Sequence, residues 1–471
     1  MQLFETLEQY GEQPALINEQ GEPISHRELA KMADETVQGL APRQLVFCLC
    51  SNSFSSIIGY VGLIRQGHVC VMLASNIDET RLQNLVERFR PNYVLGPVGV
   101  LETLGYQEER RVREYIFSKV STATIEMHPD LMLLMTTSGS TGNPMLVRIS
   151  KSNALSNAQS IIQSLDLTSD DRALITLPMN YTYGLSIINS QLQVGGSLVV
   201  TNTTLMDRQF WNLVSTSGAT YFGGVPYTYQ MLQRIGITRL SGSSLRMLTQ
   251  AGGKLDEESV RRIHADCAAI GIQFNVMYGQ TEATARMSVL KSELVPSHPW
   301  SIGHAIPGGK LTVVNPDSGQ EVRQGEIGEL EYSGPNVAMG YATSHEDLSN
   351  EPEFGDSIRT GDLAVLETDG FLRIVGRRKR FVKIFGNRVN LDDVESLVTD
   401  SGLQAACTGI DDKITVHVID SSLEDVTALQ ESVARFIGAH KNAVEIRTIS
   451  EIPRAESGKV LYSALMGDSN D

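Results

Sequence analysis

The sequence lacks the residue patterns of several classes of protein. Its five cysteines form no CxxC pair and its nine histidines show no HExxH or HxxxH spacing, so no zinc site is predicted. Four of the cysteines stand in apolar segments, which indicates reduced, buried thiols. No apolar run is long enough to span a bilayer, and residues 1–11 lack the basic start of a signal peptide. We therefore expect a cytoplasmic protein without a membrane span.

Positive charge is also scarce. The chain has 39 lysines and arginines against 55 aspartates and glutamates, which gives a net charge of −16. This balance argues against nucleic acid or an anionic membrane as the main partner. A polyphosphate bound by such a protein must be held by local backbone amides and a few placed cations.

The order of apolar segments predicts an α/β fold. A chain of 471 residues is too long for one core, so a large domain and a smaller one are expected. Short apolar runs alternate with amphipathic stretches, as in covered, largely parallel sheets. The clearest helix is 255–271, with acids in its first turn and a glycine at its end. The predicted strands are 45–50, 69–73, 173–177, 197–200, 220–224, 246–250 and 274–278.

The texture of the sequence changes after Trp300. Glycines become frequent and the apolar runs become short, which indicates a small barrel-like sheet subdomain. The basic run GRRKRFVK (376–383) then precedes a compact α/β tail. We place a boundary at Val375–Arg380, which divides the chain into an N-terminal domain 1–376 and a C-terminal domain 377–471.

The segment TTSGSTG (136–142) follows a predicted strand and combines hydroxyl side chains with glycines. Glycines at 139 and 142 let backbone N–H groups approach an anion, and the hydroxyls add donors. Composition alone describes a surface turn equally well. The pattern GxxxxGK[ST] is absent, so this is not a Walker A loop.

The full set of motifs resembles the adenylate-forming (AMP-binding) superfamily, which includes acyl- and aryl-CoA synthetases, peptide-synthetase adenylation domains and luciferase. TTSGSTGNP is similar to the phosphate-binding loop of this superfamily, and the remaining signatures follow in the family's order. They are PMNYTYGL (178–185), QAGGKL (250–255), MYGQTEATARM (277–287), GELEYSGPNVAMGY (328–341), RTGD through GNRVN (359–390) and PRAESGKV (453–460).

The resemblance implies a two-step reaction. A carboxylate attacks the α-phosphorus of Mg·ATP to give acyl-AMP and pyrophosphate, and a thiol then accepts the acyl group. Thr281 is implied to bind the α-phosphate and Glu282 to hold Mg²⁺, while Lys459 in PRxxxGK bridges the carboxylate and the α-phosphate. A cation at that position stabilises charge that is rearranged in the transition state.

The other residues of the implied site bind the nucleotide. Tyr278 is implied to stack on adenine, Asp362 and Arg377 to contact the ribose, and Gly252 and Gly253 to lie against adenine and the substrate carboxylate. The nucleotide- and cofactor-binding set is completed by Thr136, Thr137, Ser138, Gly139, Ser140, Thr141, Gly142, Gly279 and, for the pantetheine tunnel, Gly386. In this family the C-terminal domain swivels between the two steps, and Lys379 occupies the hinge position.

Two positions depart from the family pattern. Met145 stands where the loop of this family usually carries lysine, so we expect weaker ATP binding or a looser loop, without loss of the chemistry. Tyr181 stands where many acyl-CoA synthetases have histidine, and the aspartate of amino-acid-activating domains is missing from this region. The candidate acyl-pocket residues are Tyr181, Tyr183, Phe222 to Val225 and Ala283 to Met287.

Several alternatives stay open at this point. The substrate is an aryl, fatty or other acyl acid, or an amino acid in a stand-alone adenylation enzyme. The acceptor thiol is coenzyme A or the phosphopantetheine arm of a separate carrier protein, since no carrier motif follows Lys459. A nucleotide-binding pseudoenzyme that serves as an interaction module is the competing reading, and it rests on Met145 alone.

Overall fold

The computed structural model shows a mixed α/β protein with two compact units. The first unit contains residues 1–311 and 332–358, and the second contains 312–331 and 359–471. The boundary expected at Val375–Arg380 lies within the second unit. The division into domains 1–376 and 377–471 concerns the segment that is expected to swivel, and it stays a prediction. The described residues are 3–136, 145–385, 387–419, 423–455 and 460–466.

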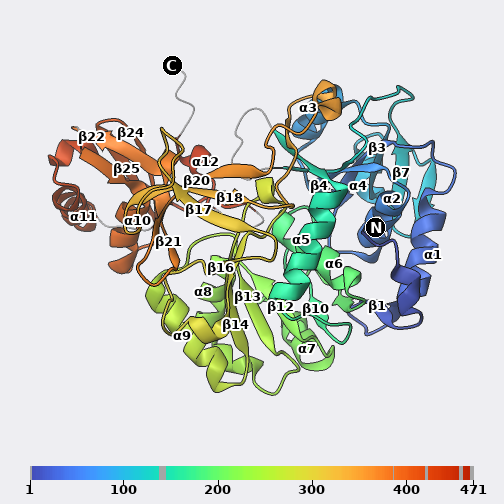
Figure 1. The fold of residues 1–471 in the computed structure, drawn as a ribbon, viewed down its shortest axis with the longest axis horizontal. Helices are drawn as coiled ribbons and strands as arrows, with labels where there is room; N and C mark the ends of the chain where they lie inside the picture. The colour runs from blue at the N-terminus through green and yellow to red at the C-terminus, as the bar shows by residue number, and fades with distance from the viewer. Residues whose placement is uncertain (1–2, 137–144, 386, 420–422, 456–459, 467–471) are drawn as a thin grey trace. The chain divides into compact units, whose positions relative to one another are not determined.

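A nine-stranded sheet carries much of the first unit (Figure 1). Its six central strands are parallel, as the alternation of strand and helix in the sequence predicts. The strands, in spatial order, are β16 (His304–Ala305), β15 (Ser288–Leu290), β14 (Gln273–Tyr278), β13 (Met247–Gln250), β12 (Tyr221–Gly224), β10 (Arg172–Leu174), β11 (Ser197–Val199), β1 (Pro14–Ile17) and β2 (Pro23–Ser25).

An eight-stranded sheet forms the rest of the first unit's framework. Its four central strands, β8, β4, β3 and β5, are parallel, and antiparallel strands continue the sheet on both sides. In spatial order the strands are β19 (Gly340–Ala342), β9 (Leu146–Ser150), β8 (Leu131–Thr136), β4 (Val69–Ala74), β3 (Leu45–Cys50), β5 (Tyr93–Pro97), β7 (Tyr115–Lys119) and β6 (Arg110–Val112).

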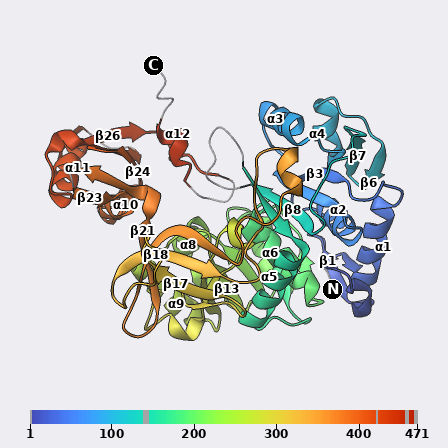
Figure 2. The same ribbon diagram turned by 45° about the horizontal axis from the view of Figure 1, so that its top comes forward.

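Helices α1, α2, α5 and α6 pack between these two sheets. One continuous apolar core contains side chains of all four helices and of both sheets. The helices α2 and α6 are buried along almost their whole length, as expected for helices with sheets on both sides. Figure 2 shows α3 and α4 on the other side of β3 from α2. The buried side chains of α3 and α4 belong to a second apolar cluster.

The bounds of the first unit's helices are η1 (Leu7–Tyr10), α1 (His26–Val37), α2 (Phe54–Arg65), α3 (Glu79–Phe89), α4 (Val98–Thr103), α5 (Lys151–Ser164), α6 (Thr182–Gln193), α7 (Arg208–Thr216), α8 (Pro226–Ile235), η2 (Ile237–Leu240), α9 (Glu257–Ala269), η3 (Thr281–Ala283), η4 (Ser292–Leu294) and η5 (His345–Ser349). Within the described part of the chain, every helix is too short or too polar to traverse a bilayer.

The second unit is built on three small sheets. A four-stranded sheet has the order β17 (Lys310–Val314), β18 (Ile327–Ser333), β20 (Ser357–Leu366) and β21 (Leu372–Arg377). The other elements are η6 (Arg378–Arg380), the pair β22 (Phe381–Ile384) and β23 (Asn387–Asn390), the sheet of β24 (Ala405–Ile410), β25 (Lys413–Ile419) and β26 (Val444–Ile449), and the helices α10 (Leu391–Asp400), α11 (Leu423–Phe436), η7 (Lys441–Ala443) and α12 (Tyr462–Met466).

Candidate active site

The predicted site residues of the first unit stand at the carboxyl ends of strands. Thr136 is the last residue of β8, Gly252 and Gly253 follow β13, and Tyr278 is the last residue of β14. Ligands of α/β sheets commonly bind at this edge. The remaining predicted loop residues Thr137, Ser138, Gly139, Ser140, Thr141 and Gly142, and also Gly386 and Lys459, lie outside the described residues.

The turn after β14 has a tightly folded backbone. A Cβ atom at Gly279 would lie 1.7 Å from the carbonyl oxygen of Ala285, so only glycine fits there. Thr284 and Ala285 adopt positive φ angles of 55° and 119°, which are unfavourable for residues with a side chain. Strained backbone of this kind is concentrated at functional sites, where surrounding contacts maintain it. The motif YGQTEA therefore begins a tight turn whose backbone conformation is strained.

The carboxylate of Glu282 is held in place within this turn. The hydroxyl of Tyr341, on β19, donates to Glu282 Oε1 at 2.8 Å, and the backbone N–H of Ala338 donates to the Glu282 carbonyl at 2.9 Å. Burial, and then the nearby carboxylate, raises the pKa of Tyr341, so its hydroxyl stays protonated and donates at neutral pH. The sequence alone did not indicate this partner, which is 59 residues away.

This arrangement fits a magnesium ion bound mainly through a nucleotide. Mg²⁺ usually takes one or two protein carboxylates and completes its shell with phosphate oxygens and water. Tyr341 donates to one oxygen of the Glu282 carboxylate and thereby fixes its direction. When bound, the ion would neutralise phosphate charge. Glu282 is thus suited to the metal-binding role that the motif implies.

Thr281 and Tyr278 are positioned by neighbouring helices and strands. The hydroxyls of Thr281 and Thr182, the first residue of α6, lie 2.9 Å apart and form a hydrogen bond. The half-buried Tyr278 packs against a small apolar cluster that includes Ala283 and Met287. The backbone N–H of Met287 donates to the Tyr278 carbonyl at 2.9 Å and closes the turn.

The two glycines after β13 permit close packing. Gly252 has a φ of 83°, and a Cβ atom there would lie 2.5 Å from the Tyr181 hydroxyl oxygen. A Cβ atom at Gly253 would lie 3.0 Å from Pro226, and the Gly253 carbonyl accepts a hydrogen bond from Gln250 at 2.8 Å. The structure thus brings Tyr181, a candidate pocket residue, next to a predicted nucleotide-binding glycine.

The candidate acyl pocket contains large aromatic side chains. The Tyr183 hydroxyl donates to the Thr249 carbonyl at 2.9 Å, and a Cβ atom at Gly223 would lie 2.7 Å from that hydroxyl oxygen. The rings of Tyr181 and Tyr183 meet edge to face at 6.3 Å. Tyr183 of α6 thus lies against β12 and β13.

The predicted ribose-binding residues form a pair within the second unit. Asp362 on β20 and Arg377 on β21 are directly opposite each other in the antiparallel register, and Arg377 Nε donates to Asp362 Oδ1 at 3.0 Å. Asp362 is 4% exposed, whereas the Arg377 side chain is 66% exposed. The proposed hinge residue Lys379 lies in η6.

Comparison with known proteins establishes the family. The family model for AMP-binding enzymes matches residues 3–342, and the chain belongs to this family. The sulfoacetate–CoA ligase of Cupriavidus necator is 30% identical over 340 residues, which make up 70% of this chain and 65% of that protein. A feruloyl-CoA synthase of Amycolatopsis sp is 29% identical, with 70% of this chain and 68% of that protein covered.

Solved structures show the same fold. The o-succinylbenzoate CoA synthetase of Bacillus subtilis, bound to its acyl-adenylate intermediate, has a TM-score of 0.80 at 19% identity, with 100% of this chain and 99% of that chain covered. ATP-bound MatB of Rhodopseudomonas palustris has a TM-score of 0.77 at 22% identity, with 98% of each chain covered. The predicted α/β fold with a small C-terminal sheet domain is therefore confirmed.

Proposed function

We propose that this protein activates a carboxylic acid with ATP and transfers it to a thiol. In the first step a carboxylate oxygen bonds to the α-phosphorus, the bond to the β-phosphate oxygen breaks, and pyrophosphate leaves. In the second step the thiol sulfur attacks the acyl carbon and AMP leaves. The observation that carries the proposal is the Glu282–Tyr341 pair in a strained turn whose neighbour Thr281 is fixed by Thr182.

The residues act mainly by positioning charge. Glu282 would hold Mg²⁺, Thr281 would donate to the α-phosphate, and the backbone at Gly252 would lie beside the nucleotide. Asp362 would bind the ribose hydroxyls, which its short carboxylate suits. Lys459 would stabilise the charge that moves during adenylation, and the segment 377–471 would then swivel at Lys379 for thioester formation.

Carboxylate-dependent exchange of pyrophosphate into ATP tests the first step. We expect exchange with at least one acid from a panel of fatty, aryl, dicarboxylic and amino acids, and detection of the acyl-AMP by mass spectrometry. Retained ATP binding without exchange for any acid would instead identify a pseudoenzyme. Incubation of the adenylate with coenzyme A or with a phosphopantetheinylated carrier protein then identifies the acceptor. A cytoplasmic location fits either acceptor.

The Lys459→Ala variant separates the two half-reactions. Because Lys459 is assigned to adenylation alone, exchange should fall by about 100-fold or more, the usual effect of losing a charge contact in a transition state. Thioester formation from supplied acyl-AMP should persist. Equal losses in both half-reactions would overturn the assignment of Lys459.

A further inference from the structure

Arg286 carries a buried positive charge that has no anionic partner within the described part of the chain. It is 2% exposed and lies on the strained turn after β14. Its Nη2 donates to the Ser186 hydroxyl at 3.1 Å and its Nη1 contacts the Met277 sulfur at 2.9 Å. Its Nε has no hydrogen-bond partner among the residues that the structure describes. Among the described residues no carboxylate pairs with this guanidinium group.

Another buried arginine shows what a structural arginine looks like in this protein. The Arg148 side chain is also fully buried, but it forms an ion pair with Glu353 at 3.0 Å. It also donates to the carbonyls of Tyr341 and Asn350, at 3.0 and 2.6 Å. Buried charges are ordinarily paired in this way, because removal from water is costly. Arg286 departs from that rule.

Neutral groups compensate only part of the cost at Arg286. Its guanidinium lies 4.4 Å from the centre of the Tyr183 ring, in a cation–π contact. Burial lowers the pKa of Arg286, although the nearby tyrosines oppose that shift. An arginine side chain stays protonated in proteins, so Arg286 keeps its charge although burial disfavours it. We infer that its anionic partner is present only during the reaction.

The position of Arg286 places this anion close to the reacting carboxylate. On α6, Thr182 bonds to Thr281, the residue assigned to the α-phosphate, and Ser186 bonds to Arg286 one turn later. One helical turn is about 5.4 Å. Carbon–carbon bonds of about 1.5 Å let a short acid span that distance. A Cβ atom at Gly223 or Gly252 would lie 2.7 or 2.5 Å from a tyrosine hydroxyl oxygen, so tyrosine side chains occupy the space beside both glycines.

We propose that Arg286 binds a second anionic group of the acid substrate, a carboxylate or a sulfonate within a few bonds of the carboxylate that is adenylated. The preferred substrate class is thus a short dianionic acid. This inference rests on the proposed function. The contact would give the buried guanidinium the counter-charge that it lacks among the described residues.

Matched acid pairs test the proposal in the wild-type protein. Pyrophosphate exchange is measured with propionate against malonate, butyrate against succinate, and butyrate against 3-sulfopropionate. The kcat/KM of the dianionic acid should exceed that of its partner by on the order of 100-fold, as for a buried charge pair. A preference for the monoanionic acids would overturn the inference and leave the proposed function intact. Absence of exchange with every acid would overturn both.

The Arg286→Gln variant tests the residue itself. The ratio of kcat/KM for the preferred dianionic acid to that for its monoanionic partner should fall by on the order of 100-fold, and Arg286→Lys should restore part of it. An unchanged ratio, with both acids affected equally, would indicate a merely structural role and overturn the assignment. Arg246→Gln is the control, because it removes an arginine at the opposite strand ends and should leave the ratio unchanged. If Arg286→Gln does not fold, the matched pairs decide the question.

Discussion

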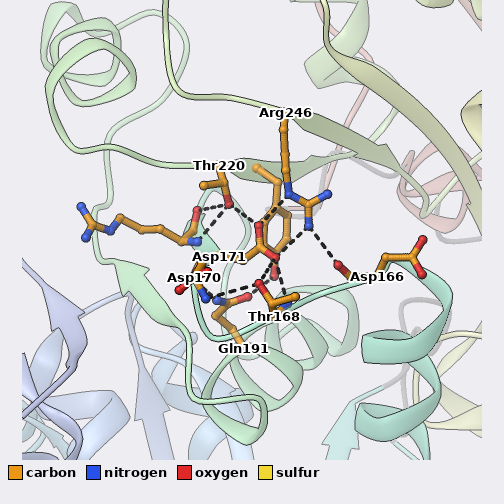
Figure 3. A network of polar contacts seen from close by, with 9 residues as sticks. Asp166, Thr168, Asp170, Asp171, Gln191, Thr220 and Arg246 are labelled. Atoms are coloured by element: carbon orange, nitrogen blue, oxygen red, sulfur yellow. Dashed lines mark hydrogen bonds and ion pairs between the residues drawn. The ribbon is translucent and has the colours of Figure 1, made fainter.

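Buried charged groups at the two ends of the strands of the nine-stranded sheet differ in whether they are paired. At the amino ends of β10, β12 and β13, Asp171 accepts hydrogen bonds from the Thr220 hydroxyl at 2.8 Å and from Arg246 at 2.7 and 2.8 Å (Figure 3). The backbone N–H of Thr168 adds a further bond at 2.9 Å. At the carboxyl ends, the backbone is strained at Thr284 and the Arg286 charge has no carboxylate partner among the described residues.

This difference separates stability from function. The buried Asp171 carboxylate accepts five hydrogen bonds, so it is satisfied within the folded chain and has no capacity left for a ligand. A turn with positive φ angles and a buried charge without a carboxylate partner among the described residues reduces stability, and we infer that it is retained for binding. Substitutions at the two edges should therefore affect different measurements.

Glu282→Gln at the carboxyl edge should have the largest effect on activity. Loss of the anionic ligand should lower exchange by on the order of 100-fold at low Mg²⁺, with partial recovery as Mg²⁺ is raised. The melting temperature should stay within a few degrees of the wild type. Glu258→Gln, which removes an exposed carboxylate on α9, is the control. Unchanged activity at low Mg²⁺ would show that Glu282 is not the metal ligand.

Asp171→Asn at the amino edge should have the reverse effect. The substitution removes the charge that pairs with Arg246, and we expect a loss of about 2–3 kcal/mol in the free energy of unfolding. Exchange per folded molecule should be unchanged. Chemical denaturation and active-site titration provide the two measurements. A loss of activity without a loss of stability would contradict the division between the edges.

The contribution of Asp171 to the free energy of unfolding should also depend on pH. Burial favours a higher pKa for Asp171, but the hydrogen bonds from Arg246, Thr168 and Thr220 outweigh it and lower the pKa. A carboxyl group whose pKa is lower in the folded state stabilises the fold above its unfolded value of about 3.9. The stability difference between wild type and Asp171→Asn should be complete at pH 7 and shrink as the pH falls below about 4.

Tyr341→Phe should have a smaller effect, because it removes one hydrogen bond to Glu282 and leaves the carboxylate in place. The phenylalanine ring keeps the edge-to-face contact that Tyr341 makes with Phe354. A bond of this kind is worth about 1 kcal/mol. The Mg²⁺ concentration for half-maximal exchange should therefore rise about fivefold. Tyr10→Phe, which removes a hydroxyl that bonds to the Gln193 carbonyl, is the matched control and should leave that concentration unchanged.

The sequence predicts the strands of this protein better than their partners. The apolar run 45–50 coincides with β3, and 274–278 falls within β14, since buried strands are continuous apolar segments. Hydrophobic pattern identifies a buried segment but not its neighbour. The parallel pairing of β1 with β11, far apart in the sequence, was therefore not predicted.

The residues of the candidate site are predictable where they lie in a family motif. Glu282 and Asp362 follow from the order of the signatures, and the structure shows the contacts each makes within its own unit. Tyr341 ends the signature GELEYSGPNVAMGY, but no motif indicates its contact with Glu282, and Asp171 lies in no motif. Tertiary packing alone fixes the partners of both residues. Arg286 lay within the predicted pocket run Ala283 to Met287, but only its burial and its contacts reveal the significance of its charge.

Met145 extends the comparison to the eight-stranded sheet. It is 38% exposed and directly precedes β9, whose Leu146 pairs with Thr136 at the end of β8. The superfamily usually carries lysine here, so Met145→Lys places a cation at the carboxyl end of β8. If the backbone amides and hydroxyls of the loop supply most of the phosphate binding, the added cation should lower the KM for ATP several-fold and change kcat little.

This pattern of kinetic constants is the signature of uniform binding, because the cation contacts the β- and γ-phosphates equally in the ground state and in the transition state. Met145→Gln controls for the loss of the apolar side chain and should not lower the KM. A pseudoenzyme would show no turnover with either residue. Reduced kcat in Met145→Lys would instead show that the methionine packs against the acyl substrate or the closed loop. An unchanged or raised KM for ATP would contradict the prediction and would place the phosphates away from Met145.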